Sequence, residues 1–134
     1  MQYLSMKHKL TLLFFHRLPV IIYCIAIFIQ SSFPAPEMIP KAFSNDKVLH
    51  FGGYALLGAL FLRALITYPI RKKRTLILLS ILCASLYGVS DEFHQSFVPS
   101  RNADVYDVLA DTVGSVLGVA AYYLLNRFSG LQKR

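Results

Sequence analysis

Four long apolar stretches take up most of this chain of 134 residues, 55% of which are hydrophobic. They cover residues 18–33, 48–68, 76–97 and 105–125, and a helix needs about 20 mostly apolar residues to cross the hydrocarbon core of a bilayer. Because backbone N–H and C=O groups in lipid must bond internally, such stretches fold as helices. The sequence therefore predicts an all-α, polytopic membrane protein: a single domain over residues 1–134, built as a bundle of four transmembrane helices.

The charged residues divide between the two sides of the predicted bundle. Ten of the basic residues precede the first stretch, fill the second loop or follow the fourth stretch: Lys7, Lys9, Arg17, Arg71, Lys72, Lys73, Arg74, Arg127, Lys133 and Arg134. All seven acidic residues fall in the opposite half: Glu37, Asp46, Asp91, Glu92, Asp104, Asp107 and Asp111. The positive-inside rule then predicts that both termini lie in the cytoplasm and that the chain spans the plasma membrane several times. This placement accounts for the net charge of +7, so we expect no nucleic-acid partner.

The first apolar stretch has two interpretations. Its basic lead and the small residues near its end, such as Ser31 and Ala35, are compatible with a cleavable signal peptide. The stretch is long for a signal peptide and lacks a clear A-x-A cleavage site, so we favour an uncleaved anchor. Cys24 and Cys83 lie inside apolar stretches, where we expect small apolar side chains that pack rather than a disulfide.

Polar side chains gather where the second, third and fourth stretches approach the acidic side. A charge at the centre of a membrane helix costs roughly 2.5–3.5 kcal/mol on insertion scales, so such residues are functional candidates. The candidate site residues are His50, Tyr54, Glu92, Gln95, Arg101, Asp104, Asp107 and Asp111. Helical spacing predicts that His50 and Tyr54 share a face and that Glu92 and Asp111 lie at one depth.

The residues around this cluster lead to further expectations. We expect Arg101, in the loop between the last two helices, to fork onto a carboxylate. Arg101 and Lys47 are the fixed cations near the acids. His94 follows Glu92 by two positions, which puts it on another helical face, where we expect it to meet lipid headgroups. The acids outnumber these cations, so two interpretations stay open: a structural network between helices, or a site for a ligand or for catalysis.

The sequence favours neither a metal site nor a cofactor. His50, His94, Glu92 and Asp111 do not form a familiar ligand spacing, so we expect no metal. An ion or proton pathway ranks last among the functions, because the opposite halves of the helices offer no polar stepping stones.

Gly114 and Gly118 form a G-x-x-x-G step on the fourth stretch. Small residues at this spacing allow close contact between membrane helices. Packing within the bundle is the simpler interpretation, and a homodimer through these glycines is the alternative.

Three motifs carry a resemblance to a known family. They are DKVLHFGGY at 46–54, DEFHQSFVPSR at 91–101, and Asp104 followed by DVLADTVG at 107–114. In order and spacing they resemble the D-K-x-x-H-F-x-x-Y, E-x-x-Q-x-F-x-P-x-R and D-x-x-x-N-x-x-G patterns of the VanZ-like family of small bacterial membrane proteins. The resemblance extends from Gln30 to Gly118, and Asp111 stands where much of the family has Asn.

The resemblance implies a role in the cell envelope, since the family is named for a protein that raises resistance to the glycopeptide teicoplanin. Our leading hypothesis is an envelope protein whose outward-facing acidic cluster binds a polar or cationic group, with membrane lipids or a lipophilic ligand as partners. The alternative is an intramembrane hydrolase or transferase that acts on a lipid headgroup, with Glu92, Asp111 and His50 as acid-base residues.

Overall fold

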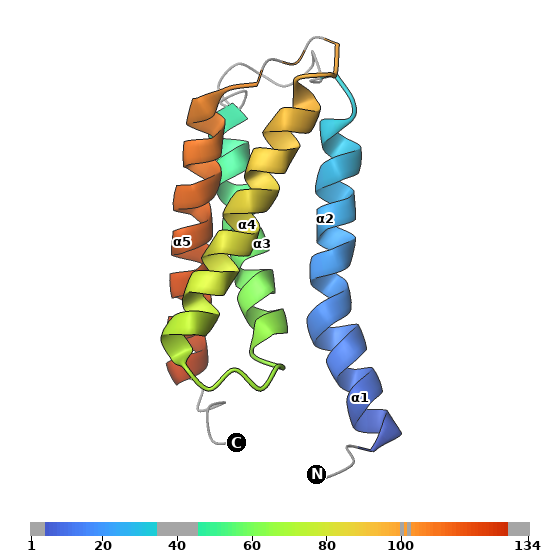
Figure 1. Ribbon diagram of the computed structural model, residues 1–134, viewed down its shortest axis with the longest axis vertical. Coiled ribbons are helices and arrows are strands. Elements are labelled where there is room, and N and C mark those ends of the chain that lie inside the picture. Colours follow the sequence, from blue (N-terminus) through green and yellow to red (C-terminus); the bar gives the residue numbers. More distant parts are fainter. Residues whose placement is uncertain (1–4, 35–45, 100, 102, 129–134) are drawn as a thin grey trace.

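The chain forms a bundle of long helices in a computed structural model, which describes residues 5–34, 46–99, 101 and 103–128 (Figure 1). The helices are α1 (Met6–Leu12), a π-helical turn η1 (Leu13–Arg17), α2 (Leu18–Ser31), α3 (Asp46–Leu65), α4 (Lys73–Gln95) and α5 (Val105–Phe128). The described residues contain no strand. Four segments are long and apolar enough to cross a membrane: Met6–Ser31, Lys47–Leu65, Lys73–Gln95 and Val105–Arg127. The prediction of an all-α, multi-pass membrane protein is therefore confirmed.

The first span begins at Met6, not at residue 18 as predicted. The side chain of Ser5 caps the helix by accepting a hydrogen bond from the backbone N–H of His8, and α1, η1 and α2 then follow without a break. Pro19 in the first turn of α2 lacks a backbone N–H. The wider π-helical turn before it keeps the chain helical, because the N–H of Leu18 bonds the carbonyl of Leu13, five residues back. The basic lead is thus part of the helix.

Helices α3 and α5 form the tightest contact in the bundle, and small residues make it possible. A Cβ added to Gly114 or to Gly118 would overlap the backbone carbonyl oxygen of Phe51 or of Ala55. These glycines therefore serve contact with α3 inside the chain, as the packing interpretation predicts. Self-association of the chain through them stays a prediction.

Helix α2 is attached to the bundle more loosely than the other three spans, and it stands beside them in Figure 1. Its only buried residues are Val20 and Ser31. Two tyrosine hydroxyls bridge α2 to its neighbours: Tyr23 donates to the carbonyl of Gly53 at 3.2 Å, and Tyr87 donates to the carbonyl of Cys24 at 2.6 Å. The bundle interior near this contact is formed by Val20, Tyr54, Leu57, Ala64 and Ala84.

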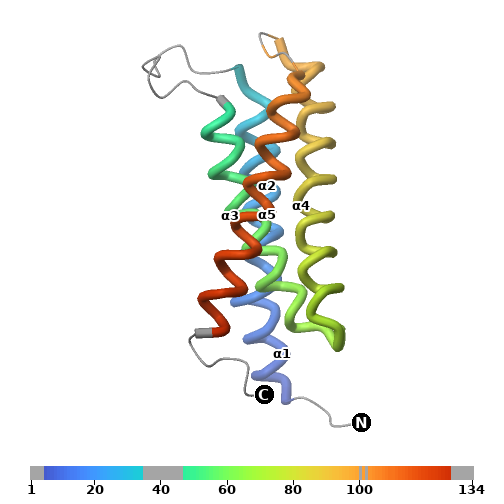
Figure 2. Tube along the Cα trace, turned by 90° about the vertical axis from the view of Figure 1, so that its left-hand side faces the viewer, coloured from blue at the N-terminus to red at the C-terminus, as the bar shows by residue number. Residues whose placement is uncertain are grey.

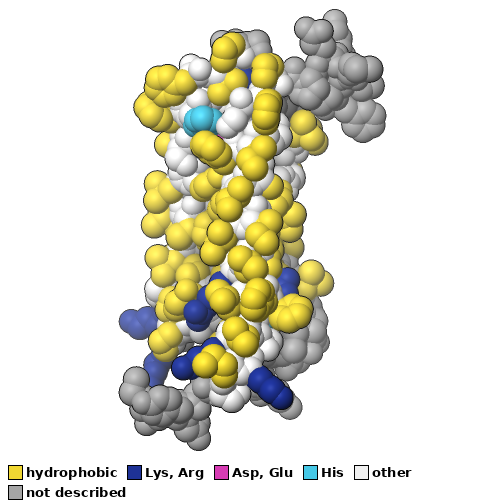
Figure 3. Space-filling model, turned by 90° about the vertical axis from the view of Figure 1, so that its right-hand side faces the viewer, with side chains coloured by type: hydrophobic (Ala, Val, Ile, Leu, Met, Phe, Trp, Pro, Cys, Tyr) yellow, Lys and Arg dark blue, Asp and Glu magenta, His cyan; other side chains and the backbone are white. Residues whose placement is uncertain are grey.

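The two ends of the bundle differ in charge. The start of α1, the α3–α4 connection and the end of α5 lie at one end, called the basic end (Figure 2). Figure 3 shows Lys and Arg side chains gathered towards that end of one face, with mostly apolar side chains along the rest of the span. The acidic end holds the start of α3, the end of α4 and the start of α5, and the polar residues predicted from the sequence lie there.

Candidate functional site

His50, one turn into α3, lies between two carboxyl groups from different helices. Its Nδ1 is 2.9 Å from Oδ1 of Asp111 on α5, and its Nε2 is 3.7 Å from Oε1 of Glu92 on α4. The residues are almost fully buried, with exposed fractions of 8% for His50, 4% for Glu92 and 0% for Asp111. The predicted common depth of the two acids is thus confirmed. An imidazole between two carboxyl groups can exchange protons with either.

Glu92 fixes the end of α4 to the start of α5 through one oxygen only. Its Oε2 accepts a hydrogen bond from the backbone N–H of Asp104 at 3.0 Å. Its Oε1 is buried and has no hydrogen-bond partner, and the same holds for Oδ2 of Asp111. A buried oxygen without a donor costs about 1–3 kcal/mol, so the site holds more acceptor capacity than these side chains satisfy.

Lys47 neutralises part of the acidic end. Its Nζ donates to Oδ2 of Asp104 at 2.6 Å and to Oδ1 of Asp107 at 3.1 Å. Asp104 also accepts the backbone N–H of Tyr106 at 2.8 Å and so caps the start of α5. The hydrogen bond from Lys47 holds the pKa of the Asp104 carboxyl below its ordinary value.

We call the residues joined in this way the His50 cluster: Lys47, His50, Glu92, Asp104, Asp107 and Asp111. The cluster combines four carboxyl groups with one lysine and one histidine, so its formal charge is negative even if the histidine is protonated. A cation or a hydrogen-bond donor would complete it.

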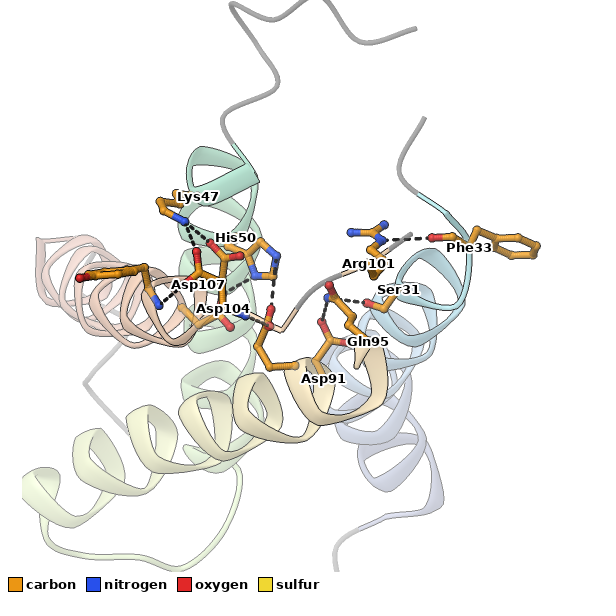
Figure 4. A network of polar contacts seen from close by, with 12 residues as sticks. Ser31, Phe33, Lys47, His50, Asp91, Gln95, Arg101, Asp104 and Asp107 are labelled. Atoms are coloured by element: carbon orange, nitrogen blue, oxygen red, sulfur yellow. Dashed lines mark hydrogen bonds and ion pairs between the residues drawn. The ribbon is translucent and has the colours of Figure 1, made fainter. Parts of the chain in front are cut away.

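Gln95 belongs to a different set of contacts, which joins α4 to α2 (Figure 4). Its Nε2 donates to Oδ2 of Asp91 at 2.9 Å and lies 3.5 Å from Oγ of Ser31. We call these three residues the Gln95 group. Each of them is at most 5% exposed. The sequence interpretation grouped Gln95 with Glu92 and left out Asp91 and Ser31. The spacing of Asp91 and Gln95, four residues apart on one helix, was the signal that could have paired them.

Tyr54 lies beneath the His50 cluster. Its ring is parallel to that of His50, with an interplanar angle of 2° and 6.2 Å between the ring centroids, as their shared helical face predicts. The tyrosine is 3% exposed, so it forms part of the packed floor of the site.

The expectation that Arg101 forks onto a carboxylate is wrong, and His94 has protein contacts that the sequence interpretation missed. Within the described part of the chain no ion pair joins Arg101 to a carboxylate, and its Nε instead donates to the carbonyl of Phe33 at 3.2 Å. His94 is half-buried: its Nε2 lies 3.0 Å from Oγ of Ser32, and its ring lies 4.6 Å from that of Phe28. Its contact with lipid headgroups stays a prediction. In both cases the partner is on or just after α2, whose position beside α4 could not be inferred from spacing along one helix.

Gly88 makes room for Asp111, a role that the sequence interpretation missed. A Cβ at this position would lie 2.6 Å from Oδ2 of Asp111. A side chain larger than hydrogen would therefore displace the carboxyl group that contacts His50.

A cavity of about 380 Å³ lies between α2 and α3 and reaches the cluster. Its lining includes the α2 residues Tyr23, Ala26, Ile27 and Gln30, the α3 residues Leu49, His50 and Gly53, and Arg101. The cavity combines apolar walls with two basic side chains, so it suits a ligand that has both an apolar and a polar part.

Comparisons with known proteins identify the family of this chain. A family model described as VanZ/LLP1 matches residues 5–126, which includes all four spans. A protein of Schizosaccharomyces pombe that is named only as uncharacterized is 30% identical over 83 residues, which is 62% of this chain and 49% of the yeast protein. The chain thus spans about half the length of that curated relative. No solved structure matches the chain.

Proposed function

The chain belongs to the VanZ/LLP1 family, and from this premise we propose that it is an envelope protein of the plasma membrane that binds a lipophilic ligand with a polar head. Both termini then face the cytoplasm, and the acidic end faces outwards. The His50 cluster receives a polar or cationic group of the ligand, and the apolar part lies between α2 and α3. By analogy with the protein after which the family is named, the ligand is linked to teicoplanin-type glycopeptide resistance.

The observation that carries this proposal is the shared position of His50. Its side chain belongs to the buried cluster and also lines the cavity between α2 and α3. Helix α2 is the loosest part of the bundle, and large side chains on it, among them Ile22, Ile25 and Ile29, are more than half exposed. A ligand can therefore approach sideways from the lipid and bring its head to the cluster without crossing the bundle.

The charge of the cluster supports a cationic or hydrogen-donating group as the part that binds. Glu92 and Asp111 each keep one buried oxygen without a hydrogen-bond partner. An ammonium group, a hydroxyl group or an ion that meets these oxygens would offset the cost of burying them. In a purely structural network, we would expect both of these oxygens to have a hydrogen-bond donor within the chain.

The test uses a glycopeptide-susceptible host that expresses the wild-type chain, the double variant Glu92→Gln with Asp111→Asn, or the control Ser96→Ala. Ser96 is exposed at the same end and donates only to the carbonyl of Phe93. We expect the wild type and Ser96→Ala to raise the minimum inhibitory concentration of teicoplanin severalfold, and the double variant to lose that increase. Size-exclusion chromatography of the purified variants shows whether each is folded. A folded double variant that protects as well as the wild type would contradict the proposal.

A second function, hydrolysis or group transfer on a lipid headgroup, is favoured by one feature of the geometry. His50 lies within 4 Å of both carboxyl groups, which allows Glu92 or Asp111 to act as general acid or base with His50 as partner. Incubation of the chain in nanodiscs with radiolabelled phosphatidylethanolamine separates the two functions. A new labelled product that the double variant does not form identifies an enzyme, and unchanged lipid identifies a binding protein.

A further inference from the structure

We infer that the cation received by the His50 cluster is a divalent metal ion, bound by Nε2 of His50 and by one carboxylate oxygen each of Glu92 and Asp107. This inference rests on the proposed function, because it names the cation that the acidic cluster binds. It departs from the expectation of no metal, which considered ligand spacing along the sequence and did not include Asp107.

The three ligand atoms converge from three helices. One ligand atom of His50 on α3, one of Glu92 on α4 and one of Asp107 on α5 all lie within 4.8 Å of one another. Zinc lies about 2.0–2.2 Å from nitrogen and carboxylate ligands, which places the ligand atoms of a tetrahedral site roughly 3.5 Å apart. The 3.7 Å between Nε2 of His50 and Oε1 of Glu92 is close to that separation, so small side-chain adjustments complete the site.

An unpartnered oxygen points into the site and gives independent support for a ligand. Oε1 of Glu92 is buried and without a hydrogen-bond partner, and at 3.7 Å from Nε2 it is too far for a hydrogen bond. The other oxygen of this carboxylate is occupied by the backbone N–H of Asp104. Glu92 is thereby held in place with one oxygen left for coordination.

Asp111 orients the histidine for metal binding. Its Oδ1 lies 2.9 Å from Nδ1 of His50. In the metal-bound state that we infer, Nδ1 donates its proton to this oxygen and Nε2 binds the ion. Histidines that bind metals commonly donate their second ring nitrogen to a carboxylate in this way, which fixes the tautomer and the ring orientation.

Lys47 is the main opposing interaction. Its Nζ lies 3.1 Å from Oδ1 of Asp107 and 2.6 Å from Oδ2 of Asp104. When the ion binds Asp107, Lys47 keeps its shorter contact with Asp104. The side chains of Lys47 and Asp104 are 44% and 37% exposed, so this ion pair lies at the solvent-facing edge of the cluster.

The donor set indicates the class of metal. One imidazole nitrogen with two carboxylate oxygens suits Zn²⁺ or Mn²⁺, whereas Mg²⁺ and Ca²⁺ prefer oxygen ligands alone. Three protein ligands also leave at least one coordination position open, and a polar head brought through the cavity at His50 can occupy it.

The experiment measures binding of Zn²⁺ alone by isothermal titration calorimetry to the full chain, purified in detergent and treated with a chelator. We expect one ion per chain. His50→Ala, Glu92→Gln and Asp107→Asn should each weaken binding at least tenfold. Asp111→Asn keeps an oxygen that can accept the N–H of Nδ1 but removes the negative charge that raises the basicity of the histidine ligand, so it should weaken binding about tenfold. The matched control is Asp91→Asn, which removes a buried acid at the same end outside the proposed ligands and should leave the affinity for Zn²⁺ unchanged.

Thermal unfolding with and without Zn²⁺ provides a second readout. A bound ion should raise the unfolding temperature of the wild type and of Asp91→Asn, but not of Asp107→Asn.

Absence of one-to-one binding in the wild type overturns the inference. Equal binding by the three ligand variants also overturns it, because that result would mean an adventitious ion only. If Zn²⁺ does not bind while the teicoplanin response still depends on Glu92 and Asp111, the metal inference fails and the proposed function stands. If Zn²⁺ binds as expected but the response does not depend on these acids, the proposed function fails instead.

Discussion

Oδ1 of Asp111 lies 2.9 Å from Nδ1 of His50, although the two residues are 61 positions apart in the chain. Asp111 has an exposed fraction of 0% and His50 one of 8%. This contact joins α5 to α3 at the acidic end, and Glu92 on α4 approaches the other nitrogen of the same ring at 3.7 Å. One imidazole thus links the three most closely packed helices and is the centre of the candidate site.

Gly88→Ala is predicted to disturb this centre from outside it. The added Cβ would lie 2.6 Å from Oδ2 of Asp111, and overpacking of this kind costs about 1–3 kcal/mol. We expect Gly88→Ala to unfold at a lower temperature in detergent, as measured by intrinsic fluorescence. Gly52→Ala is the control, because a Cβ there meets nothing within 4 Å. Alanine has a greater helix propensity than glycine, which stabilises this variant by up to about 1 kcal/mol. Equal unfolding temperatures for the two variants would contradict the role of Gly88.

Gln95→Ala is predicted to loosen α2. The variant removes the donor that lies 2.9 Å from Oδ2 of Asp91 and the contact with Ser31. A buried acceptor left without its donor costs about 1–3 kcal/mol, so we expect a lower unfolding temperature. Ser96→Ala, one position further along, is exposed and should behave as the wild type. A Gln95→Ala variant as stable as Ser96→Ala would argue against the contact.

Asp104→Asn is predicted to have an effect on stability that depends on pH. The hydrogen bond from Lys47 lowers the pKa of Asp104 below 3.8 in the folded chain. The ionised carboxyl therefore stabilises the folded state above pH 3.8. This stabilisation is lost as the pH falls through the lowered pKa. Asn can still accept the N–H of Tyr106, which isolates the effect of charge. We expect the variant to unfold at a lower temperature than the wild type at pH 7, with the difference shrinking below about pH 4. A difference that stays constant across that range would exclude the ion pair as its source.

The orientation in the membrane is predicted from charge placement and can be measured by cysteine labelling. In a background with Cys24→Ala and Cys83→Ala, we expect Ser96→Cys to react with a membrane-impermeant maleimide in intact cells. Lys9→Cys, at the basic end, should react only after the cells are permeabilised. Both positions are exposed in the folded chain, so the membrane alone limits the reaction. The reverse pattern would place the acidic end in the cytoplasm.

The helices were largely predictable because the constraint on them is local. A backbone that crosses lipid must satisfy its own hydrogen bonds, and this requirement acts on each apolar stretch separately. The predicted last helix, 105–125, matches the observed Val105–Phe128 closely. The first helix differed most, because the prediction began it after the basic residues that precede the apolar stretch, whereas the observed helix includes them and passes through a π-helical turn before Pro19.

The sequence by itself determined the class of the protein, its four spans, its two oppositely charged ends and the identity of most cluster residues, since each of these follows from composition or from spacing along one helix. Only the tertiary structure decided which side chains meet. It separated Gln95 from Glu92, turned Arg101 and His94 towards α2, and brought Asp107 close enough to His50 and Glu92 to share an ion. The physical reason is that these contacts depend on the rotation and depth of one helix relative to another. The close contact between helices at residues such as Gly88 and Gly114 sets this rotation and depth.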